Sequence, residues 1–220
     1  MKRTLRILFF TISFLALRST VCAQPFIDEI RTFRHQDSVH TPPKNANLFV
    51  GSSSLRMWTD IQDYFPGYKI INRGFGGSSL PDVIRYVPDI IYAYHPSQIL
   101  IYCGENDLAA SDTVTATTVA ARFRELFKMI RTKWPSMPVV FISIKPSPSR
   151  EKLMPKMVEA NRLIRNFLRT QKNTRYVDVY TLMLTKDGKL RPELYREDKL
   201  HMNAMGYAIW KKALLPVMKK

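Results

Sequence analysis

The chain has 220 residues, 45% of them hydrophobic, so it is long enough to bury one substantial core but short for two independent ones. Its formal net charge is +16, yet the Lys and Arg residues are spread along the chain without a basic motif interleaved with aromatic residues, which argues against nucleic-acid binding. The four histidines and two cysteines show no metal-ligand spacing, so we expect neither a metal centre nor another cofactor.

The first 23 residues have the pattern of a signal peptide. Basic residues at positions 2, 3 and 6 precede an apolar run over residues 7–17, and Val21, Cys22 and Ala23 then form a cleavage site. A run of 11 residues is shorter than the ~20 that a membrane-spanning helix needs. We therefore expect cleavage after Ala23, a secreted or periplasmic protein, and no integral membrane span in the mature chain. Cys103 would then have no disulfide partner within the chain.

Residues 24–46 form a polar N-terminal arm, for which we expect one short helix and a turn at Pro42 and Pro43. Short apolar runs then alternate with longer helical patterns. Strands are expected over residues 47–50, 69–72, 98–103, 138–144 and 174–179, and helices over residues 55–64, 80–94, 114–134, 154–171 and 204–218. Near-continuous apolar strands are typical of a parallel sheet with helices on both faces. The pattern predicts the α/β class: a three-layer α/β/α sandwich with a central parallel five-stranded sheet, in one domain over residues 47–220.

Polar and glycine-rich segments follow four of the expected elements. They are Gly51-Ser52-Ser53-Ser54 after the first strand, Gly74-Phe75-Gly76-Gly77-Ser78 after the second, Gly104-Glu105-Asn106-Asp107 after the third, and Asp198-Lys199-Leu200-His201 before the last helix. Ligands of parallel sheets bind outside the carboxyl ends of the strands, so we expect these segments to meet there. A hydroxyl, a glycine-rich backbone, an amide and an Asp/His pair are the groups that acyl transfer needs.

Each of these segments also has a purely structural interpretation. A serine before a helix is often an N-cap, and a glycine-rich loop can be a tight turn or a phosphate cradle, although the lysine of a P-loop is missing here. Asn106 can be a turn residue, His201 a surface histidine, and Asp198 a helix cap. Their occurrence together, in this order and at these strand ends, favours the catalytic interpretation.

The four segments resemble the blocks of the SGNH hydrolases, also called GDSL esterases, and the resemblance extends over residues 47–216. It implies the flavodoxin-like fold of that family, with Ser53 as nucleophile, His201 as its base and Asp198 orienting the histidine. It also implies an oxyanion hole formed by the backbone N–H groups of Ser53 and Gly77 and the side-chain amide of Asn106, without a metal or cofactor.

One position departs from the family pattern. Ser52 stands where the family has an aspartate before the nucleophile. Serine at this place resembles platelet-activating-factor-acetylhydrolase-like and carbohydrate-esterase-like members, so activity is expected to persist, while the assignment of a substrate becomes weaker. The G-x-S-x-G elbow of the lipase-like α/β hydrolases is absent from the sequence.

The predicted function is that of a serine esterase, a carboxylic ester hydrolase. No long apolar insertion that would form a lipase lid occurs between the blocks, which favours short acyl groups such as acetyl on a carbohydrate or small molecule. Two alternatives remain: an acylhydrolase for lysophospholipid or platelet-activating-factor-like lipids, and an inactive glycan-binding protein on the same fold. Arg73 and Lys145 lie where an anionic group of a small-molecule or glycan ester substrate would be met, but each can instead be a solvated charge or part of a structural ion pair.

Overall fold

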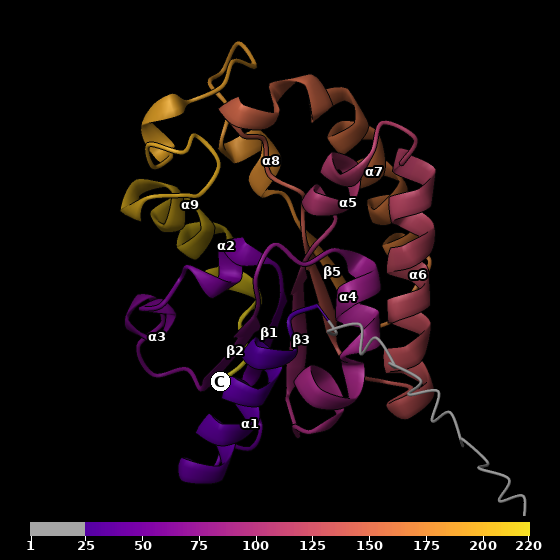
Figure 1. The fold of residues 1–220 in the computed structure, drawn as a ribbon, viewed down its shortest axis with the longest axis vertical. Helices are drawn as coiled ribbons and strands as arrows, with labels where there is room; N and C mark the ends of the chain where they lie inside the picture. The colour runs from indigo at the N-terminus through magenta and orange to yellow at the C-terminus, as the bar shows by residue number, and fades with distance from the viewer. Residues whose placement is uncertain (1–24) are drawn as a thin grey trace, which may run out of the picture.

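The computed structural model describes residues 25–220 of the protein (Figure 1). The predicted signal peptide and its cleavage site lie outside the described residues. The central sheet has five parallel strands in the order β2-β1-β3-β4-β5. The strands are β1 (Asn47–Gly51), β2 (Ile70–Gly74), β3 (Gln98–Tyr102), β4 (Val139–Ile142) and β5 (Thr174–Val177). The chain direction across the sheet reverses between β1 and β3, which is where ligands of such sheets bind.

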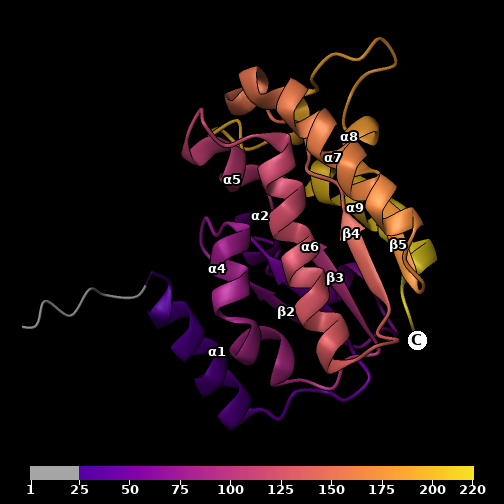
Figure 2. The same ribbon diagram turned by 90° about the vertical axis from the view of Figure 1, so that its right-hand side faces the viewer.

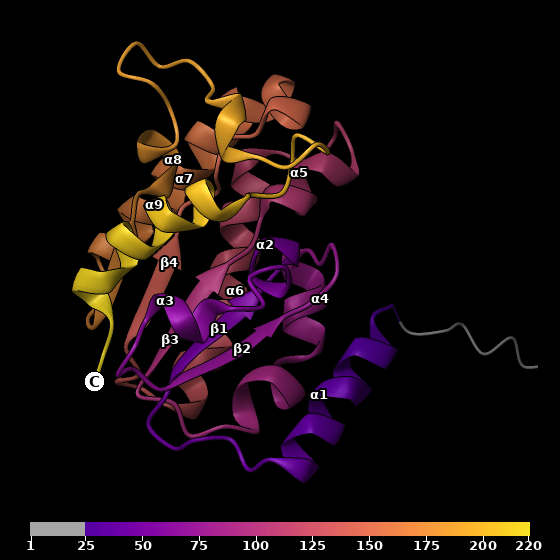
Figure 3. The ribbon, with the colours of Figure 1, turned by 90° about the vertical axis from the view of Figure 1, so that its left-hand side faces the viewer.

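Alternate residues of each strand pack against opposite helical layers. In β1, Leu48 and Val50 join one core cluster, while Phe49 joins the other. The first cluster is covered by α1 (Ile27–Val39), α4 (Leu80–Arg85), α6 (Ala116–Lys133) and α7 (Met154–Arg169), which Figure 2 shows. The second is covered by α3 (Ile61–Tyr64), α8 (Val179–Leu182) and α9 (Ala204–Leu214), which Figure 3 shows. The predicted three-layer α/β/α sandwich with a parallel five-stranded sheet is thereby confirmed.

Three of the predicted helices are wrong in extent. The helix expected over residues 55–64 is two short ones, α2 (Ser53–Arg56) and α3, because the intervening Trp58 turns inward and stacks on Tyr207 at 4.8 Å. The helix expected over residues 80–94 ends at Arg85 and resumes as a π-helical turn at Pro88, whose ring cannot continue an α-helix. The last helix ends at Leu214 and is followed by a 3₁₀ turn, Leu215–Val217.

The N-terminal arm folds as α1 and is fixed to the rest of the structure by polar contacts. Arg34 bonds to Asp89 at the start of the π-helical turn, at 2.8 Å. Glu29 accepts the backbone N–H of Gly76 at 3.0 Å and pairs with Arg56 of α2 at 2.8 Å. The arm thus supports the glycine-rich loop that follows β2. No helix within residues 25–220 is long and apolar enough to cross a membrane.

Candidate active site

The turn between β1 and α2 depends on Gly51. Its φ of +143° is unfavourable for other residues, and a Cβ there would lie 1.8 Å from the carbonyl oxygen of Tyr102 in the neighbouring strand. The close approach lets the chain turn directly from β1 into α2. Ser52 and Ser54 are buried, at 3% and 2% exposure, whereas Ser53 is partly exposed as the first residue of α2. The hydroxyl that a substrate can reach in this turn is therefore that of Ser53.

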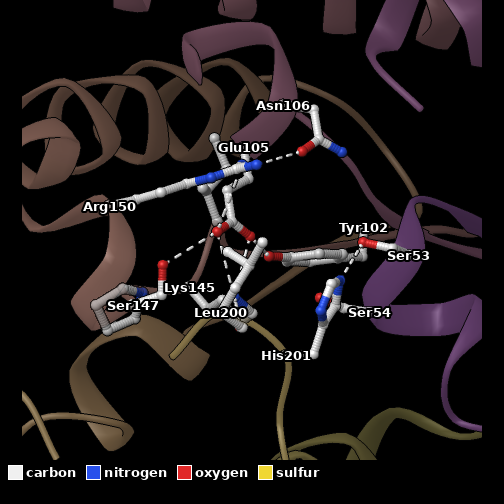
Figure 4. Close-up of polar contacts among 12 residues, drawn as sticks. Ser53, Ser54, Tyr102, Glu105, Asn106, Lys145, Ser147, Arg150, Leu200 and His201 are labelled. Atoms are coloured by element: carbon white, nitrogen blue, oxygen red, sulfur yellow. Dashed lines mark hydrogen bonds and ion pairs between the residues drawn. The ribbon is translucent and has the colours of Figure 1, made fainter. Parts of the chain in front are cut away.

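Ser53, His201 and Asp198 form a continuous chain of hydrogen bonds. His201 Nε2 lies 2.9 Å from Ser53 Oγ, and His201 Nδ1 lies 2.6 Å from Asp198 Oδ2 (the first contact is dashed in Figure 4). The other carboxylate oxygen, Oδ1, accepts the backbone N–H groups of Leu200 and His201, each at 2.9 Å. The Asp198 carboxylate can only accept a hydrogen bond, so the ring nitrogen that faces it, Nδ1, carries the proton of the neutral imidazole. The other nitrogen, Nε2, is then free to take the proton of the Ser53 hydroxyl.

These hydrogen bonds also set the charge of Asp198. Partial burial alone would raise its pKa, but the bonds from the His201 ring and from the N–H groups of Leu200 and His201 outweigh burial and lower the pKa from 3.8 to about 2. The carboxylate therefore stays charged throughout the range in which histidine works as a base, and can stabilise an imidazolium at Nδ1.

The lowered pKa predicts a pH dependence of stability. A carboxyl group whose pKa is lower in the folded state stabilises the fold above its unfolded pKa and loses this contribution as the pH falls through the folded pKa. The thermal midpoint of the wild type should therefore exceed that of Asp198→Asn at neutral pH, and the difference should shrink between pH 3.8 and about 2. Thermal unfolding of both proteins across this pH range measures the difference in midpoint. A difference that stays constant down to pH 2 would show that the carboxylate charge is not its source.

The loop that carries His201 is held on both sides. Lys199 adopts a left-handed conformation with φ +56°, and its carbonyl accepts the N–H of Ser149 at 3.1 Å. The carbonyl of Leu200 accepts Lys145 Nζ at 2.8 Å. The imidazole is thus positioned by neighbouring segments as well as by Asp198.

The glycine-rich loop and Asn106 face each other beside Ser53. The Phe75 N–H and the Ser78 hydroxyl both donate to the Gly51 carbonyl, at 3.0 and 3.2 Å, which ties the loop to the end of β1. Asn106, the second residue of α5 (Glu105–Ala110), donates from Nδ2 to the Ser78 carbonyl at 3.1 Å. A Cβ on the exposed Gly77 would lie 3.8 Å from this nitrogen. The structure therefore joins Ser53, His201 and Asp198 by hydrogen bonds, and it places Asn106 next to Gly77 on a loop that is tied to the end of β1.

Asp107, the residue after Asn106, makes only structural contacts. It is fully buried, and its carboxylate accepts the Leu80 N–H at the start of α4 and Arg122 Nη1, both at 2.8 Å. Burial raises the pKa of Asp107, although these two bonds oppose the shift. The side chain holds α4 and α6 together and lies away from Ser53 and His201.

Arg73 and Lys145 are both committed to internal partners. Arg73 pairs with Asp37 of α1 and donates from Nε to the Tyr94 hydroxyl at 2.5 Å. Lys145 is fully buried and lies 3.1 Å from Glu105. Burial lowers the pKa of Lys145, while the charge of Glu105 opposes this change. Both residues fit the structural-ion-pair alternative, and neither has the exposure that binding a substrate directly would require.

Within residues 25–220 there is no group of three or more His, Cys, Asp or Glu side chains arranged to hold a metal ion. The chemistry available at Ser53 needs none. We therefore expect ester hydrolysis to be unchanged after incubation with a chelator such as EDTA, followed by an assay in chelator-treated buffer. Activity that is lost in the chelator and restored by zinc would contradict this expectation.

Comparisons with known proteins identify the family of the chain. A sequence profile of the GDSL-like lipase/acylhydrolase family matches residues 49–209, whereas no protein with a curated description matches the chain. Among solved structures, a protein from Streptococcus pneumonia, provisionally described as a platelet activating factor, has a TM-score of 0.75 at 21% identity, over 87% of this chain and 92% of that one. A GDSL-like lipase from Bacteroides thetaiotaomicron has a TM-score of 0.71 at 17% identity, over 86% of this chain and 96% of that one.

An acetyl-xylooligosaccharide esterase variant from Geobacillus Stearmophilus has a TM-score of 0.62 at 16% identity, over 79% of this chain and 94% of that one. At these identities the structural likenesses show the fold, and the matched profile shows the family. This is the same family as the one that the four sequence blocks resemble. The chain belongs to the GDSL-like lipase/acylhydrolase family and is a hydrolase that acts on esters.

Proposed function

We propose that the protein is a serine esterase in which Ser53 is the nucleophile, His201 its base and Asp198 the residue that orients and stabilises the histidine. The observation that carries the proposal is the hydrogen-bond chain from Ser53 Oγ through the imidazole to the Asp198 carboxylate, at 2.9 and 2.6 Å. A nucleophile within hydrogen-bond reach of a base, and a base oriented by a third group, define a site for nucleophilic catalysis.

In the first half of the reaction, Ser53 Oγ attacks the ester carbonyl while His201 Nε2 takes its proton. The resulting imidazolium gives that proton to the leaving alcohol, and an acyl-enzyme remains on Ser53. Water then enters, loses a proton to the same nitrogen and attacks the acyl carbon. Collapse of this second intermediate releases the acid and returns the proton to Ser53.

The negative oxygen that develops in both steps would be held by three donors. As the first residue of α2, Ser53 has no intrahelical partner for its backbone N–H. The Gly77 N–H lies on the facing loop, and Asn106 Nδ2 lies beside Gly77. Donors fixed in advance need no rearrangement during the reaction, and losing one typically raises the barrier by about 3 kcal/mol.

We further propose that the acyl group is short, with acetyl on a carbohydrate or small molecule as the substrate. Two observations support this proposal. The matched region has no long apolar insertion of the kind that covers lipase sites. One of the structurally similar proteins is an acetyl-xylooligosaccharide esterase.

The substrate proposal is tested with nitrophenyl esters of increasing chain length, acetylated oligosaccharides and a lysophospholipid. The expected result is the highest kcat/KM for acetyl esters, a fall with each added carbon pair, and release of acetate from the oligosaccharides. A kcat/KM that rises with chain length, together with turnover of the lysophospholipid, would favour the lipid alternative. Binding of oligosaccharides without hydrolysis of any ester would favour the glycan-binding alternative.

Export remains a proposal that rests on the pattern of residues 1–23. It is tested by N-terminal sequencing of the protein recovered from the producing cell. A mature chain that begins at Gln24 would support export, and an intact chain that begins at Met1 and stays in the cytoplasm would contradict it.

A further inference from the structure

A group of charged side chains, with Glu105 and Lys145 buried, lies to one side of Ser53 and His201 (Figure 4). At its centre is Glu105, the residue before Asn106. Its Oε2 accepts the Tyr102 hydroxyl at 2.6 Å, and its Oε1 accepts Lys145 Nζ at 3.2 Å and Ser147 Oγ at 3.3 Å. These donors come from β3 and from the segment after β4, so the carboxylate is held in one position from several sides.

Arg150 lies between this carboxylate and Asn106. Its Nη1 is buried, makes no hydrogen bond within the described part of the chain, and lies 3.6 Å from Glu105 Oε1. Its Nη2 donates to Asn106 Oδ1 at 2.9 Å. Arg150 thus pairs with the charge of Glu105 through Nη1, while the planar group directs its Nη2 donor at the side chain of Asn106.

This contact determines which way the Asn106 amide faces. A guanidinium has only donors, so the amide atom opposite Arg150 must be the oxygen. On the other side the Ser78 carbonyl has only acceptor sites, so the atom there must be Nδ2, as observed at 3.1 Å. The second hydrogen of Nδ2 then remains available for a substrate oxygen beside Gly77. A flipped amide would place a donor against Arg150 and an acceptor against the developing oxyanion.

The same cluster extends to the histidine loop. Lys145, bonded to Glu105, also donates to the carbonyl of Leu200, the residue before His201. One buried carboxylate therefore supports both the amide of Asn106, through Arg150, and the loop of the histidine, through Lys145.

We propose that Arg150 is a positioning residue for ester hydrolysis, which holds the Asn106 amide with Nδ2 turned toward the oxyanion and is itself held by Glu105. The proposal rests on the proposed function, because it concerns the same site. Arg150 does not touch the substrate: it acts through Asn106. Its loss should therefore weaken transition-state binding and leave substrate binding almost unchanged.

The test is a double-mutant cycle on a nitrophenyl acetate substrate. Arg150→Met should lower kcat about tenfold and leave KM within about twofold. In an Asn106→Ala background the same substitution should change kcat by less than about twofold, because the group on which Arg150 acts is gone. Arg150→Lys, which keeps the charge opposite Glu105 but not the planar arrangement of donors, should recover part of the lost kcat. Arg162→Met is the matched control, since it removes one exposed arginine of α7 that pairs with Glu159, and it should change neither parameter.

Several outcomes would overturn the proposal. These are an unchanged kcat in Arg150→Met, an equal loss of kcat in the Asn106→Ala background, or an effect mainly on KM. If Arg150→Met does not fold, the cycle is run with Arg150→Lys, whose smaller loss of kcat, about threefold, must likewise vanish without Asn106. A wild type that neither hydrolyses esters nor reacts with a phosphonate at Ser53 would contradict the proposed function itself. An active wild type without coupling would contradict only the role of Arg150.

Discussion

Replacement of Ser53 by alanine is expected to lower kcat for ester hydrolysis by about 10⁴-fold or more, because it removes the nucleophile whose attack forms the acyl-enzyme. The protein should still fold, since the Ser53 hydroxyl bonds only to His201 among the contacts that the structure describes for it. Steady-state kinetics and a thermal unfolding curve on the same preparation check both parts.

Ser52→Ala is the matched control for this substitution. Ser52 is adjacent and buried, and the structure gives its hydroxyl no contact with His201. Most of the activity should therefore survive its loss, as it should in Ser54→Ala. Loss of activity in either control, together with an active Ser53→Ala, would show that the nucleophile is a different serine of this turn.

Replacement of Asn106 by alanine is expected to lower kcat by about 10²-fold with little change in KM, because the lost hydrogen bond forms chiefly in the transition state. The alternative is that Asn106 only shapes the start of α5, in which case the thermal midpoint would fall while activity per folded molecule survived. Kinetics and thermal unfolding measured together separate the two. A near-normal kcat with a lowered midpoint would remove Asn106 from the oxyanion hole.

Much of the fold follows from local sequence patterns. Apolar runs such as residues 99–102 are too hydrophobic for a sheet with one solvated face, so they predict buried parallel strands, and the structure confirms these strands. No local pattern predicts the short helix α5, because its six residues contain too little periodicity to detect. The break at Trp58 depends on packing against Tyr207, which lies far along the chain and leaves no local signal.

In the candidate site, too, some residues follow from local sequence patterns, whereas the roles of others depend on distant parts of the chain. The family resemblance assigns catalytic roles to five residues because each lies in a short block of the sequence: Ser53, Gly77, Asn106, Asp198 and His201. Arg73 and Lys145 were singled out for their place beside such blocks, but their surroundings are set by distant residues: Asp37 lies 36 positions before Arg73, and Glu105 lies 40 positions before Lys145. For the same reason no sequence pattern distinguishes Arg150, whose partner Asn106 lies 44 positions away.

The central claim, that His201 activates Ser53 as a nucleophile, is tested most directly by covalent labelling with a fluorophosphonate followed by mass spectrometry of the intact protein and its peptides. The account predicts a single adduct on Ser53, absent from Ser53→Ala and formed far more slowly in His201→Ala. An adduct on another residue, no adduct on the folded wild type, or labelling of Ser53 at an equal rate without the imidazole of His201 would contradict it.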